Sequence, residues 1–252
     1  MNISHQSIEN IILKSKIENK VQPWTYSGYY LFDSLWVKIN GVWNYLLALF
    51  DLELNTIIST EIVDSESSKT IQQFLDQSLR NQHKFIIITD LKKEYRESID
   101  NLHIKQQFCK FHTKQKINRE IKNYLKKNQH DLDETNEIQM FKMEIFSILD
   151  AKSLKSAKKI RDQLINKRKK LPKIIYKILW KFIIPFFKKL TFHIENQNIP
   201  STNNKIENAF QKIFPKHIKK KMKTKKGVKE RFNLKLKYWN INNSKKNYHT
   251  SF

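Results

Sequence analysis

Three acidic residues stand at positions where carboxylates are either unusual or commonly functional. Asp33 interrupts the aromatic, β-branched segment GYYLFDSLWVKI, where a short charged side chain packs poorly and must be solvated or bound. Asp90 closes the apolar run KFIIIT, and ligand-binding groups gather at the carboxyl ends of such strands in open sheets. Glu207 lies in the first turn of a helix predicted to begin near Asn204. Each acid has a structural alternative: an outward-facing Asp33, a helix N-cap at Asp90, and a capping pair of Asn204 with Glu207.

Three carboxylates drawn from distant parts of one chain suit divalent-metal chemistry. Mg²⁺ and Mn²⁺ prefer carboxylate oxygens and keep waters and substrate phosphates as their other ligands. An in-line displacement at a phosphodiester uses one ion at the attacking oxygen and a second at the leaving oxygen, roughly 3.5–4 Å apart. If the three acids converge, we expect two Mg²⁺ or Mn²⁺ ions per active site.

The segments around these acids predict an α/β protein. Residues 28–39 and 42–50 have the composition of two strands, and Asn40-Gly41 between them is the favoured dipeptide of a two-residue hairpin. The elements expected next are a strand at 56–63, a helix at 70–79, a strand at 84–89, a helix at 91–99, a strand at 104–111 and a basic helix at 112–127. This order predicts a mixed sheet, an antiparallel three-strand meander plus parallel strands, flanked by helices.

Residues 129–194 differ in kind from the segments before them. They contain no alternating run, and their apolar residues recur at helical spacing between interruptions at Pro172 and Pro185. We interpret this stretch as an all-helical insertion. The predicted organisation is a short N-terminal segment (1–27), a core formed by 28–128 and 195–240, the insertion (129–194) and a flexible basic tail (241–252).

The charge of the chain is large and unevenly distributed. The 252 residues carry 48 Lys and Arg against 24 Asp and Glu, a formal net charge of +24. Residues 1–100 hold 10 basic and 13 acidic side chains, residues 101–200 hold 23 and 9, and residues 201–252 hold 15 and 2. Basic side chains that neutralise phosphates release condensed counterions. This dense cationic surface therefore predicts a polyanionic partner, DNA or RNA. A compositional bias toward Lys, Ile and Asn is the alternative, but it leaves the slightly acidic first 100 residues unexplained.

Three basic segments are candidates for contact with nucleic acid. The densest, KHIKKKMKTKKGVKERFNLKLKYW, interleaves cations with aromatic residues, as suits phosphate contact and base stacking, with a solvated helix face as the alternative. A second strip follows Cys109, and a third is the KRKK cluster at 167–170. From the first two segments the predicted contacts are Lys114, Lys116, Lys219, Lys220, Lys221, Lys223, Lys225, Lys226 and Arg231.

Cys109 and His112 have the spacing of half a zinc site. The chain has 1 cysteine and no His-x₃₋₅-His pair follows, so zinc is disfavoured and a disulfide framework is excluded. Core packing of Cys109 is the alternative to a functional role.

Membrane and export signals are also missing from the sequence. No charge-free apolar run approaches the roughly 20 residues of a membrane helix, and residues 1–10 lack a basic-then-apolar signal pattern. We expect a soluble, cytoplasmic protein.

Four segments in order, YLFDSLWVKINGVWNYLLALFDLELNTI, FIIITDLKKEY, FCKFH and PSTNNKIENAFQKIF, resemble the DDE transposases. The similarity is to the mutator-like and related prokaryotic insertion-sequence enzymes with a Cys-x-x-His motif after the second Asp, and it covers about residues 28–239. The resemblance implies an RNase H-like core with a metal-binding triad of Asp33, Asp90 and Glu207 that catalyses DNA strand cleavage and transfer. A helical insertion between the second Asp and the Glu is also implied.

The resemblance carries further expectations. The partners would be DNA, as transposon ends and target, bound by a homodimer or larger assembly, with no membrane and a nucleoid location in a prokaryote. Cys109 and His112 would have a structural or DNA-positioning role near the active site. Family members normally carry an N-terminal DNA-binding region, and only 27 residues precede the core here. Three explanations stay open: a copy truncated at the N-terminus, the product of a frame-disrupted gene, or a protein that relies on the insertion and the basic tail to bind DNA.

Three functions stay open at this point. The first is a DDE transposase, active or decayed. The second is a catalytically inactive or domesticated nucleic-acid-binding protein of the same fold. The third is a nuclease of that fold that hydrolyses DNA without strand transfer.

Overall fold

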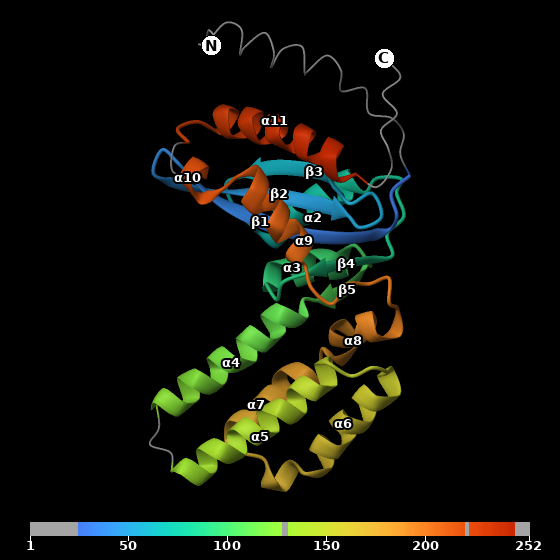
Figure 1. Cartoon of the computed structure of the whole chain (residues 1–252), viewed down its shortest axis with the longest axis vertical. Coiled ribbons are helices and arrows are strands. Elements are labelled where there is room, and N and C mark those ends of the chain that lie inside the picture. Colours follow the sequence, from blue (N-terminus) through green and yellow to red (C-terminus); the bar gives the residue numbers. More distant parts are fainter. Residues whose placement is uncertain (1–24, 128–130, 220–221, 245–252) are drawn as a thin grey trace, which may run out of the picture. The chain divides into compact units, whose positions relative to one another are not determined.

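A five-stranded mixed sheet organises the computed structural model, which describes residues 25–127, 131–219 and 222–244 (Figure 1). The strands are β1 (Tyr29–Ile39), β2 (Val42–Asp51), β3 (Thr56–Val63), β4 (Ile86–Thr89) and β5 (Lys105–Phe108), in the order β3-β2-β1-β4-β5. β1, β2 and β3 form an antiparallel meander, and helices α2 (Ser68–Ser78) and α3 (Lys93–Asn101) precede and follow β4. This strand order confirms the predicted fold class, an RNase H-like mixed sheet flanked by helices.

The β1–β2 hairpin closes through the predicted two-residue turn. Asn40 and Gly41 have φ angles of 46° and 84°, and Ile39 pairs with Val42 across the turn. Left-handed backbone at both central residues is the requirement of a type I′ turn, which Asn-Gly meets at little steric cost. The turn therefore fixes the register along the whole hairpin.

Gly28 joins the start of β1 to the start of β4. Its carbonyl accepts the N–H groups of Phe85 and Ile86, each at 3.0 Å. Its φ angle is 85°, and a Cβ atom added here would lie 2.3 Å from the Phe85 ring. The Tyr30 hydroxyl strengthens the same junction by donating to the His83 carbonyl at 2.7 Å. Only glycine fits this close approach.

The two faces of the meander are covered by different helices. Phe32 of β1 contacts Phe74 of α2, with 5.9 Å between ring centroids. Phe50 of β2 pairs with Leu31 of β1, and its ring centroid lies 6.0 Å from that of Trp239 of α11 (Lys225–Asn243). Because side chains alternate between faces, Asp33 lies on the face covered by α11.

Helix α11 is held to the sheet by aromatic and polar contacts. Its Phe232 is fully buried, 6.5 Å from Phe210 of α9 (Asn204–Ile213) and 6.0 Å from Phe214. The Asn240 amide donates to the Ile57 carbonyl at 3.0 Å and accepts the Ile57 N–H at 3.3 Å. β3 is an edge strand, so this side chain occupies backbone groups that would otherwise invite pairing with another chain.

Phe232→Ala is expected to lower the free energy of unfolding by about 3–5 kcal/mol, because it removes a fully buried aromatic ring and leaves a cavity. Urea denaturation followed by circular dichroism measures the loss. Tyr238→Ala on the same helix is the control, since Tyr238 is 56% exposed. A control variant as unstable as Phe232→Ala would contradict this packing.

Residues 131–195 are mostly helical, in keeping with their periodicity. They contain α5 (Leu132–Leu149), α6 (Leu154–Asn166), the 3₁₀ helix η1 (Arg168–Lys170), α7 (Lys173–Ile178), the π-helix η2 (Leu179–Ile183) and α8 (Phe187–Glu195), and α4 (Lys110–Lys127) precedes them. α5 begins because Asp131 accepts the Glu134 N–H, and α6 because Ser153 accepts the Ser156 N–H. Buried isoleucines and phenylalanines from these helices form one apolar core. No helix within the described ranges is long and apolar enough to cross a membrane.

The expected boundary between the last strand and the basic helix is wrong. The strand predicted for 104–111 ends at Phe108, and α4 begins at Lys110 rather than at His112. The Cys109 carbonyl accepts the Thr113 N–H at 2.9 Å, so helical hydrogen bonding starts directly after the strand. Cys109 is thus the single residue between β5 and α4.

The chain divides into two compact units. One contains the described residues up to Ile87, Glu97–Ile104 and those from Asn204 onward, and the other contains Ile88–Arg96 and Lys105–Asn203. The short helix α10 (Lys216–Lys219) belongs to the first unit. Of the tail predicted at 241–252, residues 241–243 belong to α11, and residues 245–252 lie outside the described residues, as do residues 1–24 of the predicted N-terminal segment.

Candidate active site and nucleic-acid interface

Asp33 sits in the middle of β1 beside a small neighbour. It pairs with Ala48 of β2 and is partly exposed, and the Ser34 N–H donates to its Oδ1 at 2.8 Å. Ala48 is fully buried and carries only a methyl group, which leaves room beside the carboxylate. The aromatic strand therefore accommodates an acid on the face of the sheet that α11 covers.

Glu207 belongs to a helix that packs on the strand of Asp33. α9 contacts β1, with Ile206, Ala209 and Phe210 buried on its apolar face. Glu207 is in the first turn of α9, where the helix dipole favours a negative charge, and its Oε1 is buried. The structure thus places Asp33 and Glu207 on contacting elements of one compact unit.

Asp90 follows β4 directly and belongs to the other unit. Its Oδ1 accepts the Lys92 N–H at 3.0 Å in the turn before α3, which begins at Lys93 rather than at the predicted Leu91. Thr89 fixes the end of the strand: its hydroxyl donates to the Asp90 carbonyl at 2.7 Å and accepts from Gln106 at 2.8 Å.

Asp51 shows how a structural acid differs from these candidates. It is fully buried, and its two oxygens accept the N–H groups of Ser27, Glu53 and Leu54 at 2.7–2.9 Å. Three backbone N–H groups thus occupy its acceptor sites. Among the residues that the structure describes, no group of three or more His, Cys, Asp or Glu side chains is arranged to hold a metal ion.

Cys109 and His112 lie at the junction of β5 and α4. Cys109 is fully buried, and its N–H donates to the Thr89 carbonyl at 2.8 Å. His112 is in the first turn of α4, with its Nδ1 buried and its ring edge-on to Phe111 at 5.6 Å. This burial supports the packing alternative for Cys109, and a DNA-positioning role for the pair stays a prediction.

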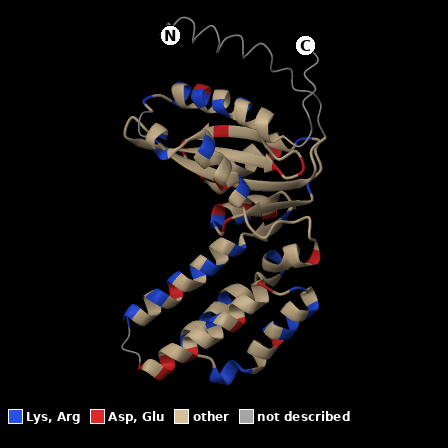
Figure 2. Ribbon diagram, in the orientation of Figure 1, with Lys and Arg blue, Asp and Glu red and all other residues tan. Residues whose placement is uncertain are grey.

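The basic residues predicted on α4 are engaged within the helical unit. Lys114 pairs with Asp150 at 2.6 Å, and Lys116 pairs with Glu120 at 2.8 Å. The two ammonium groups also lie over aromatic rings, Lys114 over Phe146 at 5.1 Å and Lys116 over Phe182 at 5.4 Å. The blue stripe of α4 in Figure 2 is therefore partly neutralised by acids of its own unit.

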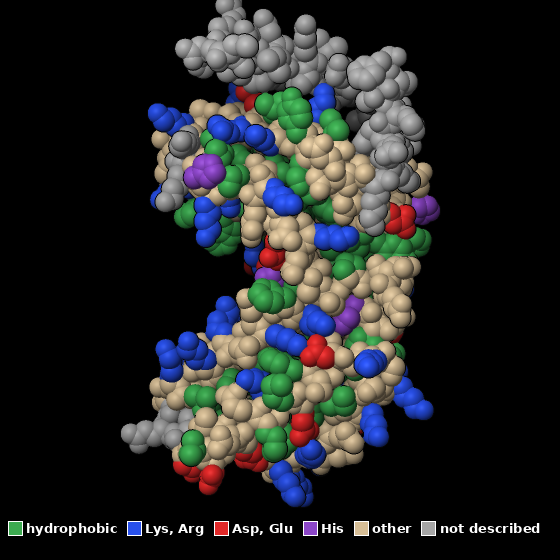
Figure 3. Space-filling view, viewed as in Figure 1, with side chains coloured by type: hydrophobic (Ala, Val, Ile, Leu, Met, Phe, Trp, Pro, Cys, Tyr) green, Lys and Arg blue, Asp and Glu red, His purple; other side chains and the backbone are tan. Residues whose placement is uncertain are grey.

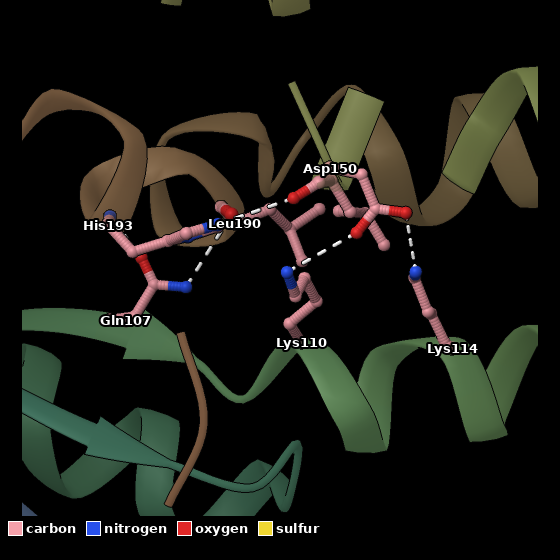
Figure 4. A network of polar contacts seen from close by, with 7 residues as sticks. Gln107, Lys110, Lys114, Asp150, Leu190 and His193 are labelled. Atoms are coloured by element: carbon pink, nitrogen blue, oxygen red, sulfur yellow. Dashed lines mark hydrogen bonds and ion pairs between the residues drawn. The ribbon is translucent and has the colours of Figure 1, made fainter. Parts of the chain in front are cut away.

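Asp150 lies at the centre of a polar network that links α4 to the end of α5 (Figure 4). Lys110 and Lys114 approach its two oxygens at 3.3 and 2.6 Å. Burial alone raises the pKa of Asp150, but hydrogen bonds from Lys114 and Lys110 outweigh it and hold that pKa below its ordinary value. This acid is therefore ionised and bound at neutral pH.

His193 of α8 completes the same region. Its Nε2 lies 3.3 Å from the Leu149 carbonyl, and its backbone N–H donates to Oε1 of Gln107 at 3.1 Å. Burial lowers the pKa of His193, with the Leu149 carbonyl opposing that shift and Lys110 adding to it. A carbonyl only accepts hydrogen bonds, so the neutral ring carries its hydrogen on Nε2.

The buried His193 predicts a pH dependence of stability. Below pH about 6.5 the unfolded chain protonates this histidine while the native protein resists it, so the free energy of unfolding falls as the pH drops from about 6.5 to the lowered native pKa. The lowered pKa of Asp150 acts in the same direction but in stronger acid, where its stabilisation is lost as the pH falls below the ordinary range of an aspartate and the carboxyl protonates.

Thermal unfolding of wild type and His193→Gln between pH 5 and pH 7.5 measures this effect. The variant is expected to show a flatter profile over this range because it cannot titrate. An identical pH dependence in both proteins would assign the effect to other groups.

The basic residues predicted on the C-terminal segment are mostly free to meet a ligand. Lys223, Lys225, Lys226 and Arg231 are exposed around α11. Lys225 pairs with Asp64 at 2.5 Å, but both side chains are more than half exposed, so the pair contributes little. Lys219 is half-buried, and burial, helped by Lys216, lowers its pKa. The predicted contacts Lys220 and Lys221 lie outside the described residues.

Comparisons with known proteins find a relative, which belongs to an insertion element. Over 238 residues, 94% of its length, the chain is 32% identical to an uncharacterized 48.3 kDa protein of insertion element ISM1 from Methanobrevibacter smithii. The chain spans 59% of the length of that relative. No protein-family model matches the chain.

Two solved structures show a distant likeness. The HTLV-2 integrase catalytic core domain in complex with magnesium, in its trimeric form, is 19% identical with a TM-score of 0.29, covering 47% of this chain and 84% of that one. A simian T-cell lymphotropic virus intasome in complex with PP2A regulatory subunit B56 gamma is 13% identical with a TM-score of 0.29, covering 50% of each chain. The fold assignment rests on the strand order β3-β2-β1-β4-β5.

Proposed function

We propose that this protein is a DNA transposase in which Asp33, Asp90 and Glu207 catalyse metal-dependent strand cleavage and transfer. The observation that carries the proposal is the packing of α9, with Glu207 in its first turn, on the strand that presents Asp33 to the same side of the sheet. The sheet order supports the third position, because Asp90 follows β4, the neighbour of β1. Similarity to an insertion-element protein over most of the chain favours the same function.

A divalent cation, Mg²⁺ or Mn²⁺, is part of the proposal. Three carboxylates are the hard oxygen donors that these ions prefer, and the buried Oε1 of Glu207 is a setting in which a cation is favourable. When bound, such ions would activate the attacking oxygen and stabilise the leaving oxygen of a phosphodiester. Asp33 and Glu207 would position these oxygens from the sheet and α9, and Asp90 from the end of β4. Two ions per site stays a prediction.

The exposed cations around α11 would hold the DNA backbone. Figure 3 shows basic side chains over α11 on the face in view. Lys223, Lys226 and Arg231 are exposed in this helix or just before it. The lysines of α4 contribute less, because their charges are already shared with Asp150 and Glu120. Transposition joins DNA ends to a target, so we also propose that a homodimer or larger assembly acts on the DNA.

Strand cleavage and transfer on a supercoiled plasmid test the function. The purified protein is incubated with a labelled duplex ending in a 3′ hydroxyl and with the plasmid, in Mg²⁺, in Mn²⁺ or in EDTA. We expect label joined to the plasmid only when a divalent ion is present. Nicking without joining would instead support the nuclease, and binding without either product would support the inactive nucleic-acid-binding protein.

A further inference from the structure

The turn end of the β1–β2 hairpin carries a cluster of exposed aromatic side chains. Trp36 and Trp43 are 51% and 50% exposed. Their ring centroids lie 6.0 Å apart at 66°, and Tyr45 stands edge-on to Trp36 at 5.6 Å and 81°. The Lys38 ammonium lies 5.7 Å from the centre of the Trp43 ring. We call Trp36, Lys38, Trp43 and Tyr45 the aromatic end of the hairpin.

The register of the hairpin produces this cluster. Trp36 pairs directly with Tyr45, and Lys38 pairs with Trp43, so all four side chains share one face. Phe32, on the same face, is buried against Phe74 of α2. The covered part of the face therefore ends before the aromatic end begins.

The size of the aromatic end argues against a protein partner. An aromatic side chain buries about 150–250 Å² when fully covered, so two half-exposed tryptophans offer roughly 200 Å². A stable protein interface buries about 800 Å² on each partner. The exposed area matches one or two flat ligands instead.

The chemistry of the aromatic end favours unpaired nucleobases. Every base offers a π-face to an aromatic side chain, whatever its sequence, and a neighbouring cation suits the phosphate that follows the base. In the edge-to-face arrangement of Trp36 and Trp43, ring surface of both residues stays open to solvent. Lys38 is exposed beside them. The aromatic end is thus complementary in shape to a base and in charge to the phosphate beside it.

We propose that the aromatic end of the hairpin binds one or two unpaired bases of a DNA strand, stacked on Trp36 and Trp43, with Lys38 on the adjoining phosphate. The proposal rests on the proposed function, since strand cleavage and transfer produce DNA ends whose bases can leave the duplex. In this proposal the aromatic end recognises unpaired DNA strands. The carboxylates and the basic residues around α11 do not distinguish such strands from a duplex.

Fluorescence anisotropy in EDTA tests this binding without requiring catalysis. The probes are a short labelled oligothymidylate and a blunt duplex of the same strand length. Trp36→Ala/Trp43→Ala is expected to weaken binding of the single strand by roughly tenfold or more while leaving duplex affinity within about twofold. Trp43→Phe, which keeps an aromatic face, and Val42→Ala, which removes only aliphatic surface, should both bind the single strand nearly as wild type does.

Several results would overturn the proposal. They are an unchanged single-strand affinity in the double alanine variant, an equal loss for single strand and duplex, or a loss as large in Val42→Ala. A change of oligomeric state in sedimentation, with single-strand binding intact, would assign the surface to a second copy of the chain. Failure of wild type to cleave DNA, with the selective single-strand loss observed, would sink the proposed function and leave this inference standing.

Discussion

Asp33→Asn, Asp90→Asn and Glu207→Gln are each expected to reduce DNA strand cleavage by on the order of 10³-fold or more. The three carboxylates are proposed to act as one unit on the same reacting phosphate, and removal of one member of such a unit costs nearly as much as removal of all. Each substitution keeps the size of the side chain and removes its negative charge. Gel analysis of nicked and joined plasmid products measures the loss.

Folding and DNA binding should survive these substitutions. Asn retains an acceptor oxygen, so Asp90→Asn keeps the hydrogen bond from the Lys92 N–H that precedes α3. The matched control is Asp76→Asn, an exposed acid that pairs with the Lys84 ammonium at 3.9 Å. We expect wild-type melting temperatures and DNA affinity in all four variants. Wild-type cleavage by any one of the three carboxylate variants would remove that residue from the site.

Removal of exposed cations around α11 is expected to weaken DNA binding more than removal of ion-paired cations on α4. Each lost phosphate contact lowers the slope of log affinity against log salt by about 0.9. Lys223→Ala/Lys226→Ala should therefore reduce the slope by up to about 1.8 and lower the affinity by about tenfold or more at low salt. Binding to a duplex across a series of salt concentrations measures both quantities.

The matched control is Lys114→Ala/Lys116→Ala, which removes the same charge. Lys114 and Lys116 are held at 2.6 and 2.8 Å by Asp150 and Glu120, so a smaller change of slope is expected. Their removal also frees two acids, and the melting temperature of the control variant separates that structural effect from binding. A larger slope change in the α4 variant would move the DNA contact from α11 to α4.

Local sequence patterns were sufficient to predict much of the fold. Asn40-Gly41 predicts the hairpin because only a type I′ turn joins two strands through that dipeptide at low cost, and its φ angles confirm it. The helix predicted to begin near Asn204 is also present, because α9 begins at that residue. The boundary between β5 and α4 depends on one backbone hydrogen bond at Cys109. The apolar pattern does not reveal that bond, so the predicted strand was three residues too long.

The candidate site was less accessible from the sequence, because side-chain roles depend on partners far along the chain. Asp51 and Asp33 both lie in apolar strands, yet Asp51 is occupied by three backbone N–H groups from turns that no local pattern specifies. Lys114 looked like a free cation, but its partner Asp150 is 36 residues away. The aromatic end of the hairpin was visible in the alternation of Trp36, Trp43 and Tyr45, but its exposure depends on where α2 ends.

The most direct test of the central claim is strand transfer by wild type and Asp90→Asn, measured side by side with a labelled duplex end and plasmid target in Mn²⁺. Asp90 is the informative position because the hydrogen bond that it accepts from the Lys92 N–H offers a purely structural explanation for an acid there. We predict joined product with wild type and none detectable with Asp90→Asn at equal DNA occupancy. Equal amounts of joined product from the two proteins would contradict a catalytic triad of Asp33, Asp90 and Glu207.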